Sequence, residues 1–133
     1  MNWQKVIIAG VVGGIVLWFY DFLMYGVVMG SIYPKYPVFN QEEGNILTFL
    51  LVEVCLALGG ALLFGKTRKV WGNGLMAGVN FGVFLGIPFF FAQFFPSMVY
   101  AGFPYHLSWC FGSITLIGWV VFGIVASLLY KDA

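Results

Sequence analysis

Long apolar stretches separated by short polar clusters dominate the pattern of hydrophobic and polar positions along this chain. Four stretches contain few charged side chains: residues 6–30, 45–65, 71–95 and 106–130. A helix needs about 20 apolar residues to cross the hydrocarbon core of a bilayer. The sequence therefore predicts an all-α integral membrane protein, with one domain over residues 1–133 that folds as an antiparallel bundle of four transmembrane helices.

Prolines and polar residues mark the connections between these spans. The first connection, Ser31 to Gly44, contains prolines followed by a polar cluster, which opposes continued helix. The second, Lys66 to Lys69, is a short basic turn, and the third runs from Pro96 to Pro104. Because the second and third connections are short, we expect the helices that they join to be antiparallel neighbours.

The composition leaves almost no material for a soluble domain. The chain of 133 residues is 62% hydrophobic, 20% aromatic and only 8% charged, and its mean hydropathy is +0.96. These values lie far outside the range of soluble globular domains. A formal net charge of +1 supplies no basic field for nucleic acid. We therefore expect a lipid bilayer as the surroundings and exclude nucleic acid as a partner.

Basic residues are distributed unevenly between the two faces of the predicted bundle. Lys35 falls alone at one face, and the opposite face carries Lys5, Lys66, Arg68, Lys69 and Lys131. Cationic loops are retained in the cytoplasm. The sequence thus predicts both termini in the cytoplasm, with the protein in an inner or plasma membrane.

Glycines recur at a spacing of four residues, which is a glycine-zipper pattern. They are Gly74, Gly78, Gly82 and Gly86 in the third span and Gly10 and Gly14 in the first. Small residues at this spacing let helix backbones approach closely in lipid. The strip serves either contacts within one chain or a seam between two copies, and we favour contacts within one chain because polytopic proteins commonly use glycine in this way.

Two acidic residues lie inside the predicted spans, Asp21 in the first and Glu53 in the second. An ionised carboxylate at the centre of a membrane helix costs at least about 2.5 kcal/mol, so both side chains should face protein or water. The two residues lie at similar depth, and we expect them to form one site. Such a pair either shares a proton, as in a transporter or proton relay, or is hydrogen-bonded locally and only fixes the helix register.

Other polar side chains gather in the same half of the predicted bundle. The candidate neighbours of the acidic pair are Tyr25, Gln93, His106, Ser108, Ser113 and Thr115. His106 is a candidate proton acceptor or metal or haem ligand, although a water-solvated histidine at the interface is the more common case. The sequence contains no nucleophile elbow, phosphate-binding loop or zinc-protease motif. We therefore predict no catalytic residues, no metal site and no enzymatic activity.

Pro88 and the run that follows it distinguish the third span. A proline inside a helix removes a backbone hydrogen bond, so a kink is expected there. Five of the seven residues 89–95 are phenylalanine. This run is either a stacking surface for a pigment, quinone or lipid, or ordinary aromatic filling and lipid-facing bulk, which we favour. No cofactor is otherwise predicted.

Two segments resemble a known family. The run from Gly14 to Gly26, GIVLWFYDFLMYG, resembles the first helix of small bacterial four-helix membrane proteins that share a domain of unknown function, the DUF seventeen-sixty-one type. A glycine-rich third helix followed by Tyr105, His106 and Leu107 at the start of the fourth is similar in layout. The resemblance implies a four-helix membrane fold and no particular activity.

Three functions are compatible with these features. The leading hypothesis is a non-catalytic accessory subunit that packs against other membrane proteins or a second copy, because the chain has glycine strips, minimal loops and no catalytic motif. The alternative is a small proton-coupled transporter or channel that uses Asp21 and Glu53. A third hypothesis is the binding of a pigment, quinone or lipid against the aromatic half of the third span.

Overall fold

The computed structural model describes residues 1–36 and 46–130, and every regular element in these two ranges is helical. The long helices are α1 (Trp3–Asp21), which continues as the π-helical segment η1 (Phe22–Val28), α2 (Ile46–Lys66), α3 (Gly74–Ala92) and α5 (Tyr105–Leu129). The short ones are η2 (Tyr33–Lys35), η4 (Arg68–Val70) and α4 (Phe95–Val99). Residues 37–45, which comprise part of the first predicted connection and the first residue of the second predicted span, lie outside the described residues, as does the predicted cytoplasmic Lys131.

Four helical stretches of the described chain are long and apolar enough to cross a membrane: Trp3–Val28, Leu47–Lys66, Gly74–Val99 and Tyr105–Leu129. Large apolar side chains cover their outer surfaces; Leu51 is 62% exposed and Phe84 65%. An apolar surface of this extent suits lipid and not water. For the described residues, the prediction of an all-helical fold with four such helices is confirmed.

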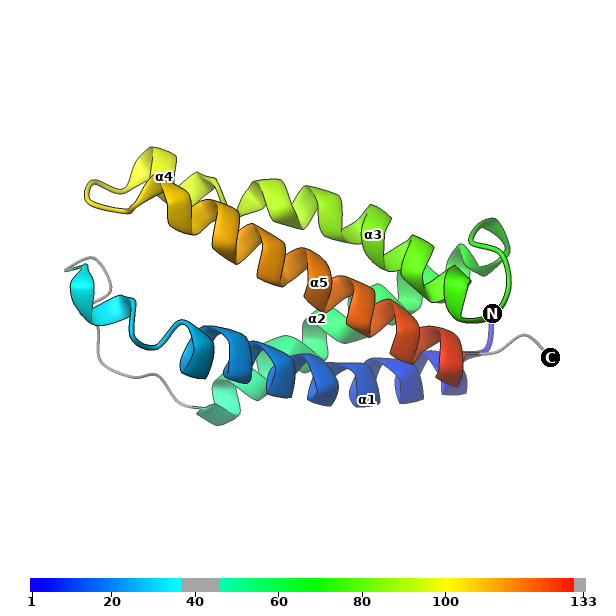
Figure 1. Cartoon of the computed structure of the whole chain (residues 1–133). Coiled ribbons are helices and arrows are strands. Elements are labelled where there is room, and N and C mark those ends of the chain that lie inside the picture. Colours follow the sequence, from blue (N-terminus) through cyan, green and yellow to red (C-terminus); the bar gives the residue numbers. More distant parts are fainter. Residues whose placement is uncertain (37–45, 131–133) are drawn as a thin grey trace.

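The long helices form two closely packed pairs, α1 with α2 and α3 with α5, and contacts between α1 and α5 join the pairs. Figure 1 shows α3 and α5 running side by side, with α1 on the other side of α5. Although α2 and α3 follow each other in the chain, their backbones approach little. Phe64 of α2 packs against Phe81 of α3 near the basic end, and farther along an apolar groove lies between the two helices. The start of α1 and the end of α5 lie at the same end of the bundle (Figure 1).

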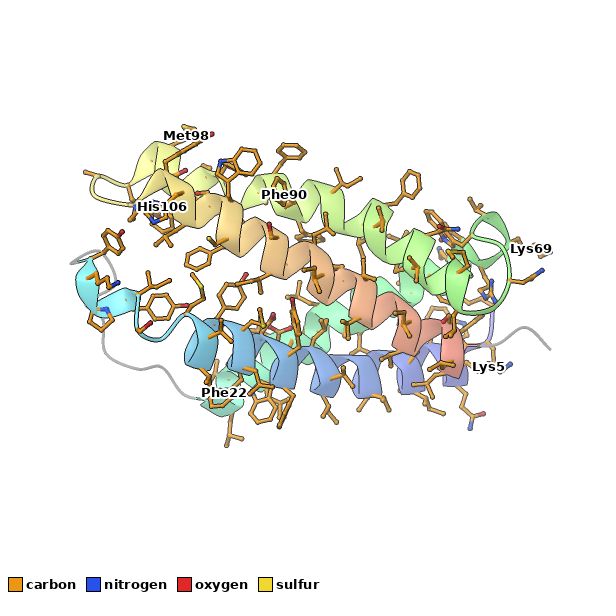
Figure 2. All side chains as sticks on the ribbon, in the orientation of Figure 1. Lys5, Phe22, Lys69, Phe90, Met98 and His106 are labelled. Atoms are coloured by element: carbon orange, nitrogen blue, oxygen red, sulfur yellow. The ribbon has the colours of Figure 1, made fainter. Side chains whose placement is uncertain are left out.

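The two ends of the bundle differ in chemistry. We call the end that carries Lys5, Lys66, Arg68 and Lys69 the basic end, and the opposite end, which carries His106, the His106 end. Figure 2 shows Lys5 and Lys69 at one end and His106 at the other. Because the long helices are antiparallel, every connection lies at one of the two ends of the bundle. The start of α1 and the connection between α2 and α3 fall at the same end, and their basic residues therefore gather there.

A buried arginine ties the basic end together. Arg68 is 7% exposed, and its guanidinium donates to the carbonyl oxygens of Gly72 at 2.6 Å and Tyr130 at 3.4 Å. The same group lies 5.4 Å from the ring centroid of Phe64, in cation–π geometry. The backbone N–H of Asn2 donates to the Tyr130 hydroxyl at 2.9 Å. The start of α1, the connection between α2 and α3 and the end of α5 are thereby linked.

Glycines set the close approach of α3 to α5. A Cβ atom added at Gly78 would overlap the carbonyl group of Gly123, and one added at Gly82 would lie 2.5 Å from the carbonyl oxygen of Trp119. A Cβ atom at Gly86 would lie 3.1 Å from the Cα atom of Leu116 in α5, a tight but longer contact. These three glycines of α3 therefore pack against a helix of the same chain, which is the interpretation that we favoured from the sequence.

Gly74 does not belong to this packing strip, and the prediction is wrong at that position. It is the first residue of α3 with φ at +68°, and a Cβ atom there would meet nothing within 4 Å. Glycine suits the position because its backbone is left-handed. In α1, by contrast, Gly10 and Gly14 do pack, against Leu58 and Val54 of α2.

The third connection also differs from the predicted loop. Residues Phe95–Val99 form α4, with Pro96 in its first turn, where the missing N–H removes no helical hydrogen bond. Pro88 lies inside α3, and the helix continues through it to Ala92. Proline therefore does not end the third span.

Candidate functional site

The structure brings Asp21 of α1 and Glu53 of α2 together. Their carboxyl groups lie within hydrogen-bonding reach of each other, and both line the same cavity. Glu53 is 5% exposed, and Asp21 is partly buried. The antiparallel arrangement of α1 and α2 explains the meeting, because the two residues lie at similar distances from the His106 end.

Close packing of α1 on α2 allows the carboxyl groups to meet. Gly14 lies two turns before Asp21 on the same face of α1, and a Cβ atom on Gly14 would lie 2.6 Å from the Cα atom of Val54. Val54 follows Glu53 directly in α2. The absence of a side chain at Gly14 therefore lets the α2 backbone approach at the level where Glu53 projects inward.

The cavity lined by the carboxyl pair has a volume of about 390 Å³ and receives side chains from all four long helices. Its other polar side chains are the neutral Tyr25, Gln93 and Thr115. Among the described residues no lysine, arginine or histidine lines it. Within the described part of the chain, the two carboxyl groups thus face each other without a cationic side chain to neutralise them.

This geometry suits a single proton shared between the two acids. An ionised carboxylate only accepts hydrogen bonds, so a bond between two carboxyl groups requires a proton on one of them. Ionising both would add mutual repulsion to the cost of removing two charges from water. Chemically, the pair is able to keep one proton, share it, and exchange it for another cation.

The first span changes its winding directly after its acidic residue. Over Phe22–Val28 the segment is π-helical, with hydrogen bonds closing five residues apart. Residues five apart are turned by about 140° on an α-helix, whereas the wider π-helix brings them near one face. Tyr20 and Tyr25 therefore both reach α5. The regular apolar pattern gave no sign of this change, and sequence reasoning missed it.

Two tyrosines tie this part of the first span to α5. The Tyr20 hydroxyl donates to the carbonyl oxygen of Ile114 at 2.7 Å. The Tyr25 hydroxyl donates to the carbonyl oxygen of Phe111 at 3.0 Å and lies 2.8 Å from the Thr115 hydroxyl. Tyr25 is therefore held by α5, and it forms one wall of the cavity that contains the carboxyl pair.

Three of the residues predicted to surround the acidic pair line the cavity: Tyr25, Gln93 and Thr115. Sequence reasoning did not connect Phe89 and Trp119 with the pair, although both line the same cavity. Aromatic residues are common throughout these spans, so composition alone could not single them out.

The other three predicted neighbours lie elsewhere. Ser108 is buried but donates to the Ser97 hydroxyl at 2.9 Å, and His106 lies near the Tyr36 hydroxyl, 3.5 Å away. Both are two turns or more from the cavity, toward the His106 end. Ser113 is exposed on another face of α5 and bonds within its own helix. Their assignment as neighbours of the acidic pair is wrong, because depth and helix face both decide contact.

The described part of the chain offers no metal centre. No three histidine, cysteine, aspartate or glutamate side chains within it lie close enough to hold a metal ion. The interpretation of His106 as a metal ligand therefore finds no partner ligands there.

The aromatic residues of the third span lie in two different environments, the interior of the bundle and its outer surface. Phe89 points inward and stacks on Trp119, with ring centroids 5.1 Å apart and an interplanar angle of 25°. Phe91 and Phe95 are 64% and 63% exposed on the outer surface. Only the inward part of the run is available to a ligand in the cavity, and the outward part covers the bundle where lipid is expected.

A second hollow lies beside the cavity, on the side where the backbones of α2 and α3 approach little. It is an apolar groove of about 560 Å³, and Cys55 and Gly59 are among its lining residues. Leu56, Phe89 and Trp119 line both spaces and form their common wall. The cavity with the carboxyl pair is therefore next to an apolar groove on the surface of the bundle.

No family model matches the chain, and no curated protein or solved structure matches it. The resemblance to small bacterial four-helix proteins accordingly stays a prediction.

Proposed function

We propose that the chain is a multi-pass protein of an inner or plasma membrane, with both termini in the cytoplasm, and acts as a small proton-coupled transporter. Asp21 and Glu53 are its proton-exchange site. One observation carries the proposal: two carboxyl groups lie within hydrogen-bonding reach of each other in a cavity of about 390 Å³ that no basic side chain of the described residues lines.

The cavity favours exchange over a purely structural role. A carboxyl pair that only fixes helix register needs no space beside it, because a close-packed core satisfies the same hydrogen bond. Ligand sites in proteins have volumes of about 300–1,000 Å³, and the cavity beside Asp21 and Glu53 falls within that range. Ionisable groups inside a membrane bundle are costly and commonly mark ion or proton pathways.

The charge distribution supports the orientation. The described basic residues of the connections and helix ends are concentrated at the basic end, where Arg68 is also buried against backbone carbonyl groups. Cationic segments remain in the cytoplasm, so the basic end is the cytoplasmic one and the His106 end faces the other side.

Flux measurements on liposomes that contain the purified protein test the proposal. A potassium diffusion potential drives protons inward, and a trapped pH-sensitive dye reports the internal pH with and without a panel of solutes. We expect a pH change above that of protein-free liposomes, its loss in Asp21→Asn and Glu53→Gln, and its retention in Ser113→Ala, whose exposed hydroxyl lies outside the cavity. Unchanged flux in Asp21→Asn removes the proposal.

An accessory subunit is the second candidate. The glycines that first motivated it, Gly10, Gly14, Gly78, Gly82 and Gly86, are occupied by contacts within the chain. Support now comes from Gly59, which lies in the exposed groove with nothing within 4 Å of an added Cβ atom, so the helix of another membrane protein has room to approach there. Purification in a mild detergent that yields only the isolated chain counts against this candidate.

A further inference from the structure

We infer that the substrate of this site is a small lipophilic cation that reaches the carboxyl pair from the bilayer, through the apolar groove between α2 and α3. This inference rests on the proposed proton-coupled function and names the class of solute exchanged. Its geometric basis is that the groove of about 560 Å³ and the cavity of about 390 Å³ share the wall formed by Leu56, Phe89 and Trp119.

The acidic side chains of the cavity indicate that the polar end of the ligand is cationic. The cavity offers two carboxyl groups and, among the described residues, no lysine, arginine or histidine to offset them. A carboxyl pair that holds one proton carries one negative charge; when a cation binds and the proton leaves, the site again carries one. A proton is therefore released for each monovalent cation bound, and neither state places a second net charge in the membrane.

The apolar lining of the groove indicates that the rest of the ligand is apolar. Its side chains are apolar or small, as at Leu51, Cys55 and Gly59, and the stacked rings of Phe89 and Trp119 stand between the groove and the carboxyl pair. The faces of such rings attract cations and pack against flat apolar groups. A ligand with an aromatic or alkyl body and a positively charged centre matches both spaces, whereas a small hydrated ion matches only the cavity.

Close packing on the basic-end side of the cavity supports the groove as the proposed route. Phe64, Phe81 and Phe122 are fully buried in the core on that side of the cavity. By contrast, Leu56, which belongs to the wall shared by the groove and the cavity, is 42% exposed. A lipophilic cation is more concentrated in the membrane than in water. A groove that faces the bilayer is therefore exposed to a high local concentration of the ligand.

Equilibrium dialysis with tetraphenylphosphonium, a permanently charged aromatic cation, tests the inference on the full chain in lipid nanodiscs. We expect saturable binding with proton release into weakly buffered solution, and much weaker binding of the neutral triphenylphosphine oxide. In Asp21→Asn and Glu53→Gln the affinity for the cation should fall at least about tenfold, as expected when a buried charge partner is removed.

A matched pair of variants tests the route. Cys55 and Cys110 are both exposed, but only Cys55 lines the groove. Cys55→Trp should block binding of tetraphenylphosphonium and Cys110→Trp should leave it unchanged, with thermal unfolding confirming that both variants fold. If Cys55→Trp does not fold, Gly59→Phe fills the same groove from a position with open space.

The outcomes separate this inference from the proposed function. Absence of saturable binding, while Asp21-dependent proton flux persists, overturns the lipophilic cation and leaves the transporter. Absence of both binding and flux overturns both. Binding that survives in Asp21→Asn, Glu53→Gln and Cys55→Trp is adsorption to the apolar surface and also overturns the inference.

Discussion

The carboxyl group of Asp21 in α1 lies within hydrogen-bonding reach of that of Glu53 in α2, inside a cavity that all four long helices line. Among the described residues, the other polar side chains that line this cavity are neutral. A shared proton is the smallest species that satisfies both acids. The proposed proton exchange and the proposed cation substrate both depend on this one relationship.

The α3–α5 contact should be the part of the fold most sensitive to added volume. Gly82→Leu places a side chain where a Cβ atom alone would lie 2.5 Å from the backbone of α5, and we expect a loss of about 1–3 kcal/mol of stability from overpacking. Thermal unfolding in detergent, monitored by circular dichroism, measures this loss of stability. Gly59→Leu, where nothing lies within 4 Å, is the control, and equal midpoints for the two variants would contradict the packing described.

Tyr25→Phe should loosen the junction between the first span and α5. The change removes a hydroxyl that donates to the Phe111 carbonyl oxygen at 3.0 Å and lies 2.8 Å from the Thr115 hydroxyl, and about 0.5–1.5 kcal/mol should be lost. Unfolding in sodium dodecyl sulphate reports the difference. Tyr100→Phe, at a residue 58% exposed, should be neutral; a similar loss there would show that the Tyr25 effect is not specific.

Arg68→Met should destabilise the basic end more than loss of a charge alone. The Gly72 carbonyl oxygen loses its 2.6 Å hydrogen bond, and an unmet hydrogen bond to a charged donor costs about 1–3 kcal/mol. Lys69→Met removes the same charge from an exposed position and is the matched control. If both variants unfold at the same temperature, Arg68 acts only as a surface charge.

The orientation is testable by labelling single cysteines in intact cells. In a chain with Cys55→Ser and Cys110→Ser, Tyr100→Cys near the His106 end should react with a membrane-impermeant maleimide. Lys69→Cys at the basic end should react only after the membrane is permeabilised, because cationic connections stay in the cytoplasm. The reverse pattern would place the termini outside.

The spans and the depth of the acidic pair could be predicted from sequence because both follow from regular helix geometry. Four apolar runs fix four helices, and a constant rise per residue places Asp21 and Glu53 at one level once the helices are antiparallel. The strip of Gly78, Gly82 and Gly86 is similarly regular, so its packing against a neighbouring helix was accessible from the spacing alone.

Features that depend on irregular backbone or on helix order could not be predicted. The π-helical turn after Asp21 breaks the periodicity from which contacts are counted, and Gly74 serves the backbone turn and not packing. Ser113 shares the depth of the site but faces away from it. Nothing in the pattern indicates that α2 and α3, adjacent in sequence, leave a groove between them.

Infrared difference spectroscopy of the protein in lipid, recorded as the pH is stepped, tests the shared proton most directly, because protonated and ionised carboxyl groups absorb at separate frequencies. We predict one protonated-carboxyl signal that is altered in both Asp21→Asn and Glu53→Gln, with the surviving acid of each variant titrating at a different pH from the wild-type pair. Two independent signals, each unaffected when the other acid is replaced, would contradict the account.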